Sequence, residues 1–269
     1  MMANEVANIV AKNSIYSLID IIKGFDLTSG LQLCLDAGDI DSYPGSGIKW
    51  LDTSGNGYDF NLGDGSTATT YPTFNGSAGA LSKNEFFSFD GGDYFSYDSA
   101  NETWMDQLHN DGAVVSFIIV HAASPTTTIL WFSTCIPSAN GFYFYTYDSN
   151  TAETVIRNTG VSAATTLLSA GWFHPTNESK FAIGGSSWSE NGGTVREVMS
   201  RGVSFGPYSA DNPQSNSNTP GAFTIGAQAD KTSKAPSGSK IACLAMWTGV
   251  ALSRQNLIDI YSLLAKRFT

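Results

Sequence analysis

The alternation of short apolar runs with turn-forming clusters limits most strongly what this chain can fold into. From about residue 31 to residue 248, short runs of β-favouring residues are separated by clusters of Gly, Asn, Asp, Ser and Pro. Helical periodicity occurs only near the two ends. Short strands with frequent turn residues are typical of sandwiches and barrels. The pattern therefore predicts an all-β, two-sheet antiparallel jelly-roll sandwich with an N-terminal helical arm and a short C-terminal helix.

The chain length is consistent with a single sandwich domain. A chain of 269 residues falls within the range of one large domain, and the polar loops are typical of surface loops rather than linkers. We divide the sequence into a helical arm, residues 1–25, and one sandwich domain, residues 26–269. Only 14% of the residues are charged, against about 25% in most soluble domains, so Ser, Thr, Asn and Gly are expected to cover the surface.

Both terminal helices are predicted from apolar spacing. At the C-terminus the stripe follows Ser253, a candidate N-cap, and Lys266 and Arg267 stand at the negative end of the helix dipole. Near the N-terminus, Asn13 or Ser14 is the candidate cap and Gly24 the stop. The C-terminal stripe consists of Leu257, Ile260, Tyr261 and Leu264, and the N-terminal apolar positions are Val6, Ile9, Val10, Ile15, Leu18, Ile19 and Ile22.

Some runs inside the sandwich carry more specific expectations. Residues 114–120 and 241–247 are apolar on both strand faces, so each face must be covered. The sequence Asp-Gly-Gly-Asp at 90–93 predicts a hairpin or a tight loop. Three widely spaced cysteines, at positions 34, 135 and 243, are expected to be buried free thiols.

The charge of the chain argues against several classes of partner. A formal charge of −10 disfavours nucleic acids and anionic membranes, because Lys and Arg supply most of the affinity for phosphate. The longest apolar runs are much shorter than the roughly 20 residues that span a bilayer. Glu5 and Lys12 interrupt the N-terminal apolar stretch, and no small-residue cleavage site follows it, so Sec-type export is not expected.

Known catalytic patterns are missing from the sequence. There is no G-x-S-x-G elbow, the three histidines are isolated, and the paired acidic strand motif of sandwich glucanases does not occur. We expect no catalytic residues, no metal ligands and no cofactor, and hence no enzyme. The acidic cluster of Asp36, Asp39, Asp41, Asp52, Asn56 and Asp59 is interpreted as turn-stabilising rather than calcium-binding.

One aromatic run is a candidate binding surface. In Gly-Phe-Tyr-Phe-Tyr-Thr-Tyr at 141–147, strand alternation directs the phenylalanines to one face and Tyr143, Tyr145 and Tyr147 to the other. Three tyrosines in a row could stack on sugar rings, and Trp188 is a candidate fourth member. The alternative, that these rings fill a sheet face or an oligomer contact, stays open.

Several segments together resemble a known family. Leu-Cys-Leu-Asp-Ala-Gly at 33–38, Ser-Tyr-Pro-Gly-Ser-Gly at 42–47, Lys-Trp-Leu-Asp at 49–52 and Ser-Gly-Asn-Gly at 54–57 are similar to the opening of concanavalin A-like, laminin-G-like jelly rolls in phage virion structural proteins. Phe-Ser-Phe-Asp-Gly-Gly-Asp-Tyr at 87–94 and the segments at 223–226 and 241–253 resemble its later signatures. The resemblance implies structural, turn-fixing roles for Asp36, Asp52 and Asn56.

Two functions follow from these observations. The first is a non-enzymatic virion structural protein, a capsid decoration or a tail or fibre component, located in the virion and forming homo-oligomers. Its N-terminal apolar stripe would dock on other virion proteins as a helix in a groove. The alternative is a carbohydrate-binding module that recognises surface glycans, such as those of a host, through the tyrosine ladder.

Overall fold

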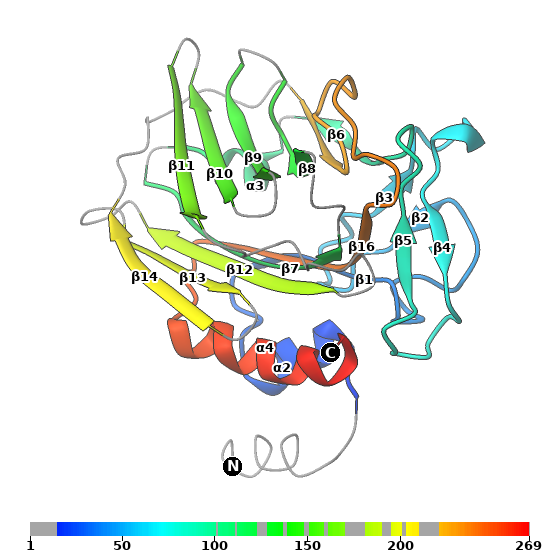
Figure 1. The fold of residues 1–269 in the computed structure, drawn as a ribbon, viewed down its shortest axis with the longest axis horizontal. Coiled ribbons are helices and arrows are strands. Elements are labelled where there is room, and N and C mark those ends of the chain that lie inside the picture. Colours follow the sequence, from blue (N-terminus) through cyan, green and yellow to red (C-terminus); the bar gives the residue numbers. More distant parts are fainter. Residues whose placement is uncertain are drawn as a thin grey trace.

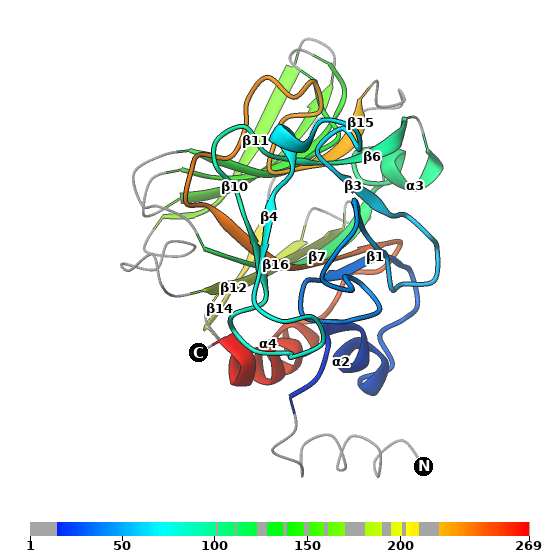
Figure 2. The same ribbon diagram turned by 90° about the vertical axis from the view of Figure 1, so that its right-hand side faces the viewer.

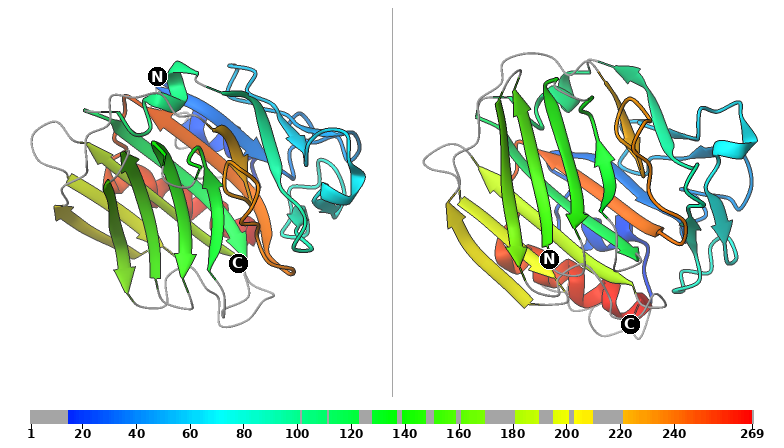
Figure 3. Two further views of the ribbon diagram at one scale, coloured as in Figure 1. Left: turned by 90° about the horizontal axis from the view of Figure 1, so that it is seen from above. Right: turned by 45° about the horizontal axis from the view of Figure 1, so that its top comes forward.

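Two antiparallel sheets are stacked face to face in the computed structural model, and two helices pack on the outside of one of them (Figure 1). The structure describes residues 15–100, 102–110, 112–122, 128–136, 139–147, 151–158, 161–169, 181–189, 195–200, 203–209 and 221–268. Viewed from above, the strands of the second sheet lie over those of the first (Figure 3). The predicted all-β, two-sheet antiparallel sandwich is confirmed.

The first sheet carries the helices. Its strand order is β14 (Val203–Ser209), β13 (Val195–Ser200), β12 (Ala182–Ser189), β7 (Val114–Ala122), β16 (Lys240–Thr248), β5 (Phe86–Ser88) and β4 (Thr73–Asn75), and β1 (Leu31–Asp36) also pairs with β16.

The second sheet carries the tyrosine run. Its order is β11 (Val161–Ser169), β10 (Thr151–Asn158), β9 (Gly141–Tyr147), β8 (Ile129–Ser133), β15 (Ala222–Ile225), β6 (Phe95–Ala100), β3 (Phe60–Leu62) and β2 (Lys49–Trp50). The helices are α2 (Leu18–Gly24), the short α3 (Thr103–Asp106) and α4 (Arg254–Phe268), with one 3-10 turn at Ala68–Thr70.

The two central strands of the first sheet are buried on both faces. On β7, Phe117 and Ile119 point into the core between the sheets, whereas Ile118 and Val120 belong to a second apolar cluster beneath the helices. On β16, Trp247 lies in this second cluster. Figures 1 and 2 both show α2 and α4 side by side under this sheet. The helices therefore supply the cover that two apolar faces require.

The C-terminal helix begins and packs as its sequence predicts. The Ser253 hydroxyl accepts from the N–H of Asn256 (3.2 Å), and the Asn256 side chain accepts in return from the N–H of Ser253 (3.0 Å). Leu257, Ile260 and Leu264 are buried in the second cluster. Burial of this stripe against β12, β13 and β14 stabilises the helix.

The N-terminal helix differs from its prediction. It begins at Leu18 with Ser17 as N-cap, because the Ser17 side chain accepts from the N–H of Asp20 (3.4 Å), so the predicted caps at 13 and 14 are wrong. Leu18, Ile19 and Ile22 are buried in the second cluster and hence cannot dock on another protein as predicted. Among the stripe positions that the structure describes, Ile15 keeps an accessible surface and is 43% exposed.

The predicted boundary at residue 25 is therefore not a structural break, since α2 packs against β1 and α4. The docking residues Val6, Ile9 and Val10 lie outside the described residues. Among the helices that are described, none has the length and apolar character needed to cross a membrane.

The Asp-Gly-Gly-Asp segment links the two sheets. It joins β5, which pairs with β4 and β16, to β6, which pairs with β3 and β15. The hairpin interpretation is thus wrong, but the tight loop is confirmed. Asp90 Oδ1 accepts from the N–H of Gly92 (2.7 Å), and Asp93 Oδ2 accepts from the N–H of Asp90 (2.8 Å).

Turn-fixing by the acidic opening segment is observed directly. Asp52 Oδ1 accepts from the N–H groups of Cys34 (2.9 Å) and Ser54 (2.9 Å). Asn56 Nδ2 donates to the carbonyls of Leu31 (2.9 Å) and Gln32 (3.0 Å). These bonds fix the loop against β1, as the sequence resemblance implied. The cysteines at 34, 135 and 243 are buried and free, as predicted.

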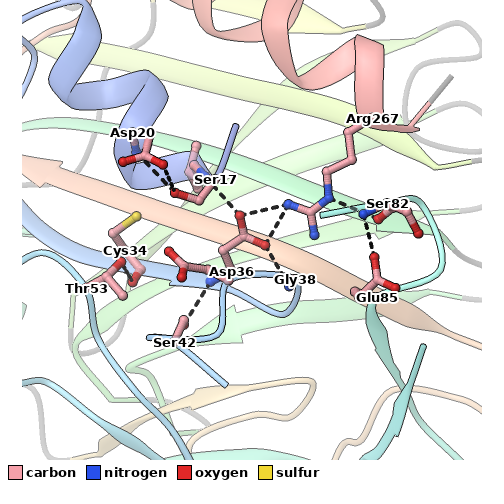
Figure 4. A network of polar contacts seen from close by, with 12 residues as sticks. Ser17, Asp20, Cys34, Asp36, Gly38, Ser42, Thr53, Ser82, Glu85 and Arg267 are labelled. Atoms are coloured by element: carbon pink, nitrogen blue, oxygen red, sulfur yellow. Dashed lines mark hydrogen bonds and ion pairs between the residues drawn. The ribbon is translucent and has the colours of Figure 1, made fainter. Parts of the chain in front are cut away.

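A buried ion pair connects the two helices to the first sheet (Figure 4). Arg267 Nη1 lies 2.8 Å from both carboxylate oxygens of Asp36, at the end of β1. The same carboxylate accepts from the N–H groups of Leu18 (2.9 Å) and Gly38 (2.9 Å). A Cβ at position 38 would meet Arg267 Nη2, so a larger residue there would displace the guanidinium from this position.

Removing the arginine should destabilise the fold strongly. Arg267→Met leaves the Asp36 carboxylate buried without its cation, which costs about 3–5 kcal/mol in comparable buried pairs. Urea denaturation should show this loss in the free energy of unfolding. Lys266→Met, an exposed neighbour on α4, is the control and should change it by less than about 0.5 kcal/mol. Equal effects of the two substitutions would contradict the role given to the ion pair.

Candidate functional site

Strand β9 places its aromatic side chains on two faces. Phe142 and Phe144 are fully buried in the core between the sheets. Tyr143 and Tyr145 point to the opposite, outer face of the second sheet, as strand alternation requires. The strand is held by β8 on one side and β10 on the other, with Tyr145 opposite Leu130 on β8.

The tyrosines form a partly covered pair rather than an exposed ladder. The ring centroids of Tyr143 and Tyr145 are 5.5 Å apart and their planes are inclined by 32°. Tyr143 is half-buried and Tyr145 is only 8% exposed. The side chain of Tyr147 lies outside the described ones. Of the three rings predicted to be accessible, the two that the structure describes lie side by side in a recess.

Trp188 does not extend this row. It lies on β12, which belongs to the first sheet, and it stands opposite Val115 of β7 and Arg196 of β13. The tyrosines lie on the second sheet. The prediction that Trp188 joins them is therefore wrong, because the sequence does not show which of the two sheets a strand enters.

The tyrosine pair forms part of a surface pocket of about 330 Å³. We call it the tyrosine pocket. Its aromatic and aliphatic side chains come from β8 and β9, and its polar groups come from the start of β8 and from the loop 226–239. The lining residues are Thr128, Leu130, Tyr143, Tyr145, Gln228, Ser233 and Lys234.

Loop 226–239 is fixed in place by its own backbone. It begins at Gly226, whose φ of +75° favours glycine and whose Cβ position is occupied by the Phe89 ring. The N–H of Ala235 donates to the carbonyl of Gly226 (2.7 Å), and the N–H of Gln228 donates to that of Ser233 (2.8 Å). Closed by these bonds, the loop holds Gln228, Ser233 and Lys234 beside the tyrosines.

The position of Lys234 depends on the tight loop between the sheets. Its Nζ donates to the carbonyl of Gly92 (2.9 Å) and lies 5.2 Å from the centroid of the Tyr94 ring. These contacts fix the ammonium group at the rim of the pocket. Polar and aromatic groups from four separate parts of the chain thus meet at one place.

Asp93 is the charged neighbour of this lysine. Burial raises the pKa of Asp93 to about 6, and the nearby charge of Asp90 acts in the same direction. The N–H of Asp90 and the charge of Lys234 oppose that shift. The carboxyl therefore changes its charge close to neutral pH.

Known structures share this fold. No family model and no curated protein sequence matches the chain. A mutant Trypanosoma rangeli sialidase with trans-sialidase activity superposes on 90% of this chain and 34% of its own, at 13% identity and a TM-score of 0.58.

Two botulinum neurotoxin structures are similar to a comparable degree. The binding domain of neurotoxin DC, in complex with SialylT, covers 88% of this chain at 9% identity and a TM-score of 0.58. A structure of botulinum neurotoxin type C, a toxin whose cell entry depends on interaction with two ganglioside molecules, covers 89% of this chain at 12% identity and a TM-score of 0.57. This chain spans 52% of both, and 34% of the sialidase. At these identities the similarity is one of fold.

Strand alternation in the sequence predicts the two tyrosines of the pocket, but no sequence pattern predicts its other side. Gln228, Ser233 and Lys234 lie in a stretch that the sequence shows only as a polar loop. Their one local sign is the Gly226 that ends β15 and turns the chain. Because residues 145 and 228 are far apart in the sequence, no sequence pattern indicates that they line the same pocket.

The titration of Asp93 should be measurable in the stability of the fold. The pKa of Asp93 in the folded chain lies above the usual value of about 3.9. The contribution of the protonated carboxyl to the free energy of unfolding is therefore fully present below about pH 4 and is lost as the pH rises through 6. Asp93→Asn should therefore gain thermal stability relative to the unmodified chain between pH 4.5 and pH 7.5. Asp41→Asn, at an exposed aspartate, is the control. A difference in Tm that does not vary with pH would contradict this assignment.

Proposed function

We propose that this chain is a carbohydrate-binding domain whose ligand occupies the tyrosine pocket. The observation that supports this function is the combination of Tyr143 and Tyr145 with the polar side chains of loop 226–239. A sugar ring has apolar C–H faces beside hydroxyl groups. It therefore needs an aromatic surface and hydrogen-bonding groups at the same place.

The chemistry of the lining matches these needs. The two tyrosine rings and Leu130 offer apolar surface, and the Gln228 amide both donates and accepts. Ser233 and Thr128 add hydroxyl groups, and Lys234 adds a cation. The volume of about 330 Å³ falls at the lower end of the range for small-molecule sites, roughly 300–1,000 Å³. A ligand of one or two sugar residues is expected.

The known structures support a binding role. One neurotoxin binding domain is in complex with SialylT, and the type C neurotoxin interacts with ganglioside molecules. The sialidase, by contrast, is an enzyme. Retaining and inverting glycosidases use a pair of carboxyl groups across the scissile bond. The described lining of the tyrosine pocket includes no Asp, Glu or His. We therefore propose binding without catalysis at this site.

The virion setting stays a prediction that rests on the sequence resemblance. It is compatible with the proposed site, because a displayed sandwich would bring the outer face of its second sheet to host-surface glycans. The homo-oligomer also stays a prediction. Burial of the α2 stripe means that attachment through Leu18, Ile19 and Ile22 is not part of the proposal.

Truncating Tyr143 should weaken sugar binding without unfolding the domain. Tyr143→Ala removes the more accessible ring, and loss of one aromatic stacking contact costs roughly 1 kcal/mol or more, a reduction in affinity of at least about fivefold. A glycan array followed by ligand-observed NMR measures the effect. Tyr261→Ala on α4, a half-buried tyrosine outside the pocket, is the matched control. Equal binding by both variants would remove the tyrosine pocket from consideration.

A further inference from the structure

We propose that the tyrosine pocket selects an acidic sugar, with the carboxylate or sulfate of the ligand paired to Lys234. This inference rests on the proposed function and specifies its ligand class. It is drawn from the placement of positive charge around the pocket.

The first observation is the fixed position of Lys234 in the pocket lining. Among the described lining residues it is the one that carries a charge. An ammonium group has three donors, and the contact with Gly92 uses one of them. The Tyr94 ring and the Gly92 carbonyl hold the group in place, so a ligand anion meets a positioned cation.

The second observation is a neighbouring ammonium group. Lys231 Nζ lies 5.5 Å from the centroid of the same Tyr94 ring that Lys234 approaches. Lys231 has a φ of +64°, in the left-handed region that disfavours residues other than glycine, and its N–H donates to the Gln228 carbonyl (2.7 Å). The Tyr94 ring thus holds two ammonium groups close to the pocket, and both attract a ligand anion.

These cations stand out in an acidic chain. The protein has 24 acidic residues against 14 Lys and Arg residues, so its overall field repels anions. At physiological ionic strength the Debye length is about 8 Å. Charges farther away are largely screened, so the local potential is set by the nearby groups, which are Lys234 and Lys231 on one side and Asp90 and Asp93 on the other. Selection of an acidic ligand is therefore a property of this site rather than of the whole surface.

Asp93 opposes the attraction and gives the inference a second test. Its carboxylate lies close enough to Lys234 for that charge to lower the pKa of Asp93, while Asp90 acts in the opposite direction. Removing the carboxylate charge should leave the local potential more positive. Asp93→Asn should therefore bind the acidic sugar more tightly than the unmodified chain.

The experiment compares three sugars that share one ring. Galactose, galacturonic acid and galactose 6-sulfate are titrated into the full chain by NMR at 50 mM and 300 mM salt. The acidic sugars should bind roughly five- to tenfold more tightly than galactose at low salt, because a charge-assisted hydrogen bond is about twice as strong as a neutral one. Comparison of galacturonic acid with galactose 6-sulfate shows whether carboxylate or sulfate is preferred. Added salt should reduce the difference in affinity between the acidic sugars and galactose.

Variants assign the effect to the lysine. Lys234→Met should remove the preference, so that the two acidic sugars and galactose bind that variant with equal affinity, whereas Lys234→Arg should retain the preference. Lys240→Met is the matched control, because Lys240 Nζ also lies over a ring, 5.0 Å from Phe86, but outside the pocket. The melting temperature of each variant checks its fold.

The outcomes separate the two proposals. If none of the three sugars binds, both the proposed function and the acidic preference are overturned. If all three bind equally, or if Lys234→Met keeps the preference, only the acidic ligand class is overturned. A preference that is lost in Lys234→Met and increased in Asp93→Asn supports both.

Discussion

The carboxylate of Asp36 holds together segments that are far apart in the sequence. It receives the guanidinium of Arg267 from the last turn of α4 and the N–H of Leu18 from the first turn of α2. Gly38 closes the turn that follows β1 on the same carboxylate. Both carboxylate oxygens of Asp36 accept hydrogen bonds, and Arg267 Nε donates to the Ser82 carbonyl (3.0 Å), which offsets much of the cost of burying the charged pair. The positions of both helices on the first sheet therefore depend on this contact.

The two helices allow the central strands of the first sheet to be apolar on both faces. Strands β7 and β16 are apolar on both faces, and without α2 and α4 the side chains of the second cluster would lie against water. With that face covered, the first sheet can act as a rigid layer on which the second sheet packs through its phenylalanines. The outer face of the second sheet is consequently the one left for binding, and β9 presents Tyr143 and Tyr145 there.

The tyrosine pocket combines a rigid strand with a fixed loop. Strand pairing positions the rings, whereas the position of Lys234 is set by the backbone of loop 226–239 and by its bond to Gly92 in the crossover between the sheets. A site built from rigid elements loses little conformational entropy when a ligand binds. The same crossover contains Asp93, so the charge at the rim and the connection between the sheets are physically linked.

Local periodicity in the sequence determined the fold class, the C-terminal helix with its Ser253 cap, and the division of residues 142–145 between core and surface. These features depend on neighbours within a few residues, so the chain encodes them directly. Only the tertiary structure decided the contacts between distant segments. It placed Trp188 in the other sheet, turned the Asp-Gly-Gly-Asp segment into a crossover and buried the α2 stripe under the fold. It also placed Lys234 and Tyr145 in the lining of one pocket, because contacts between distant segments depend on packing across the whole molecule and leave no period in the sequence.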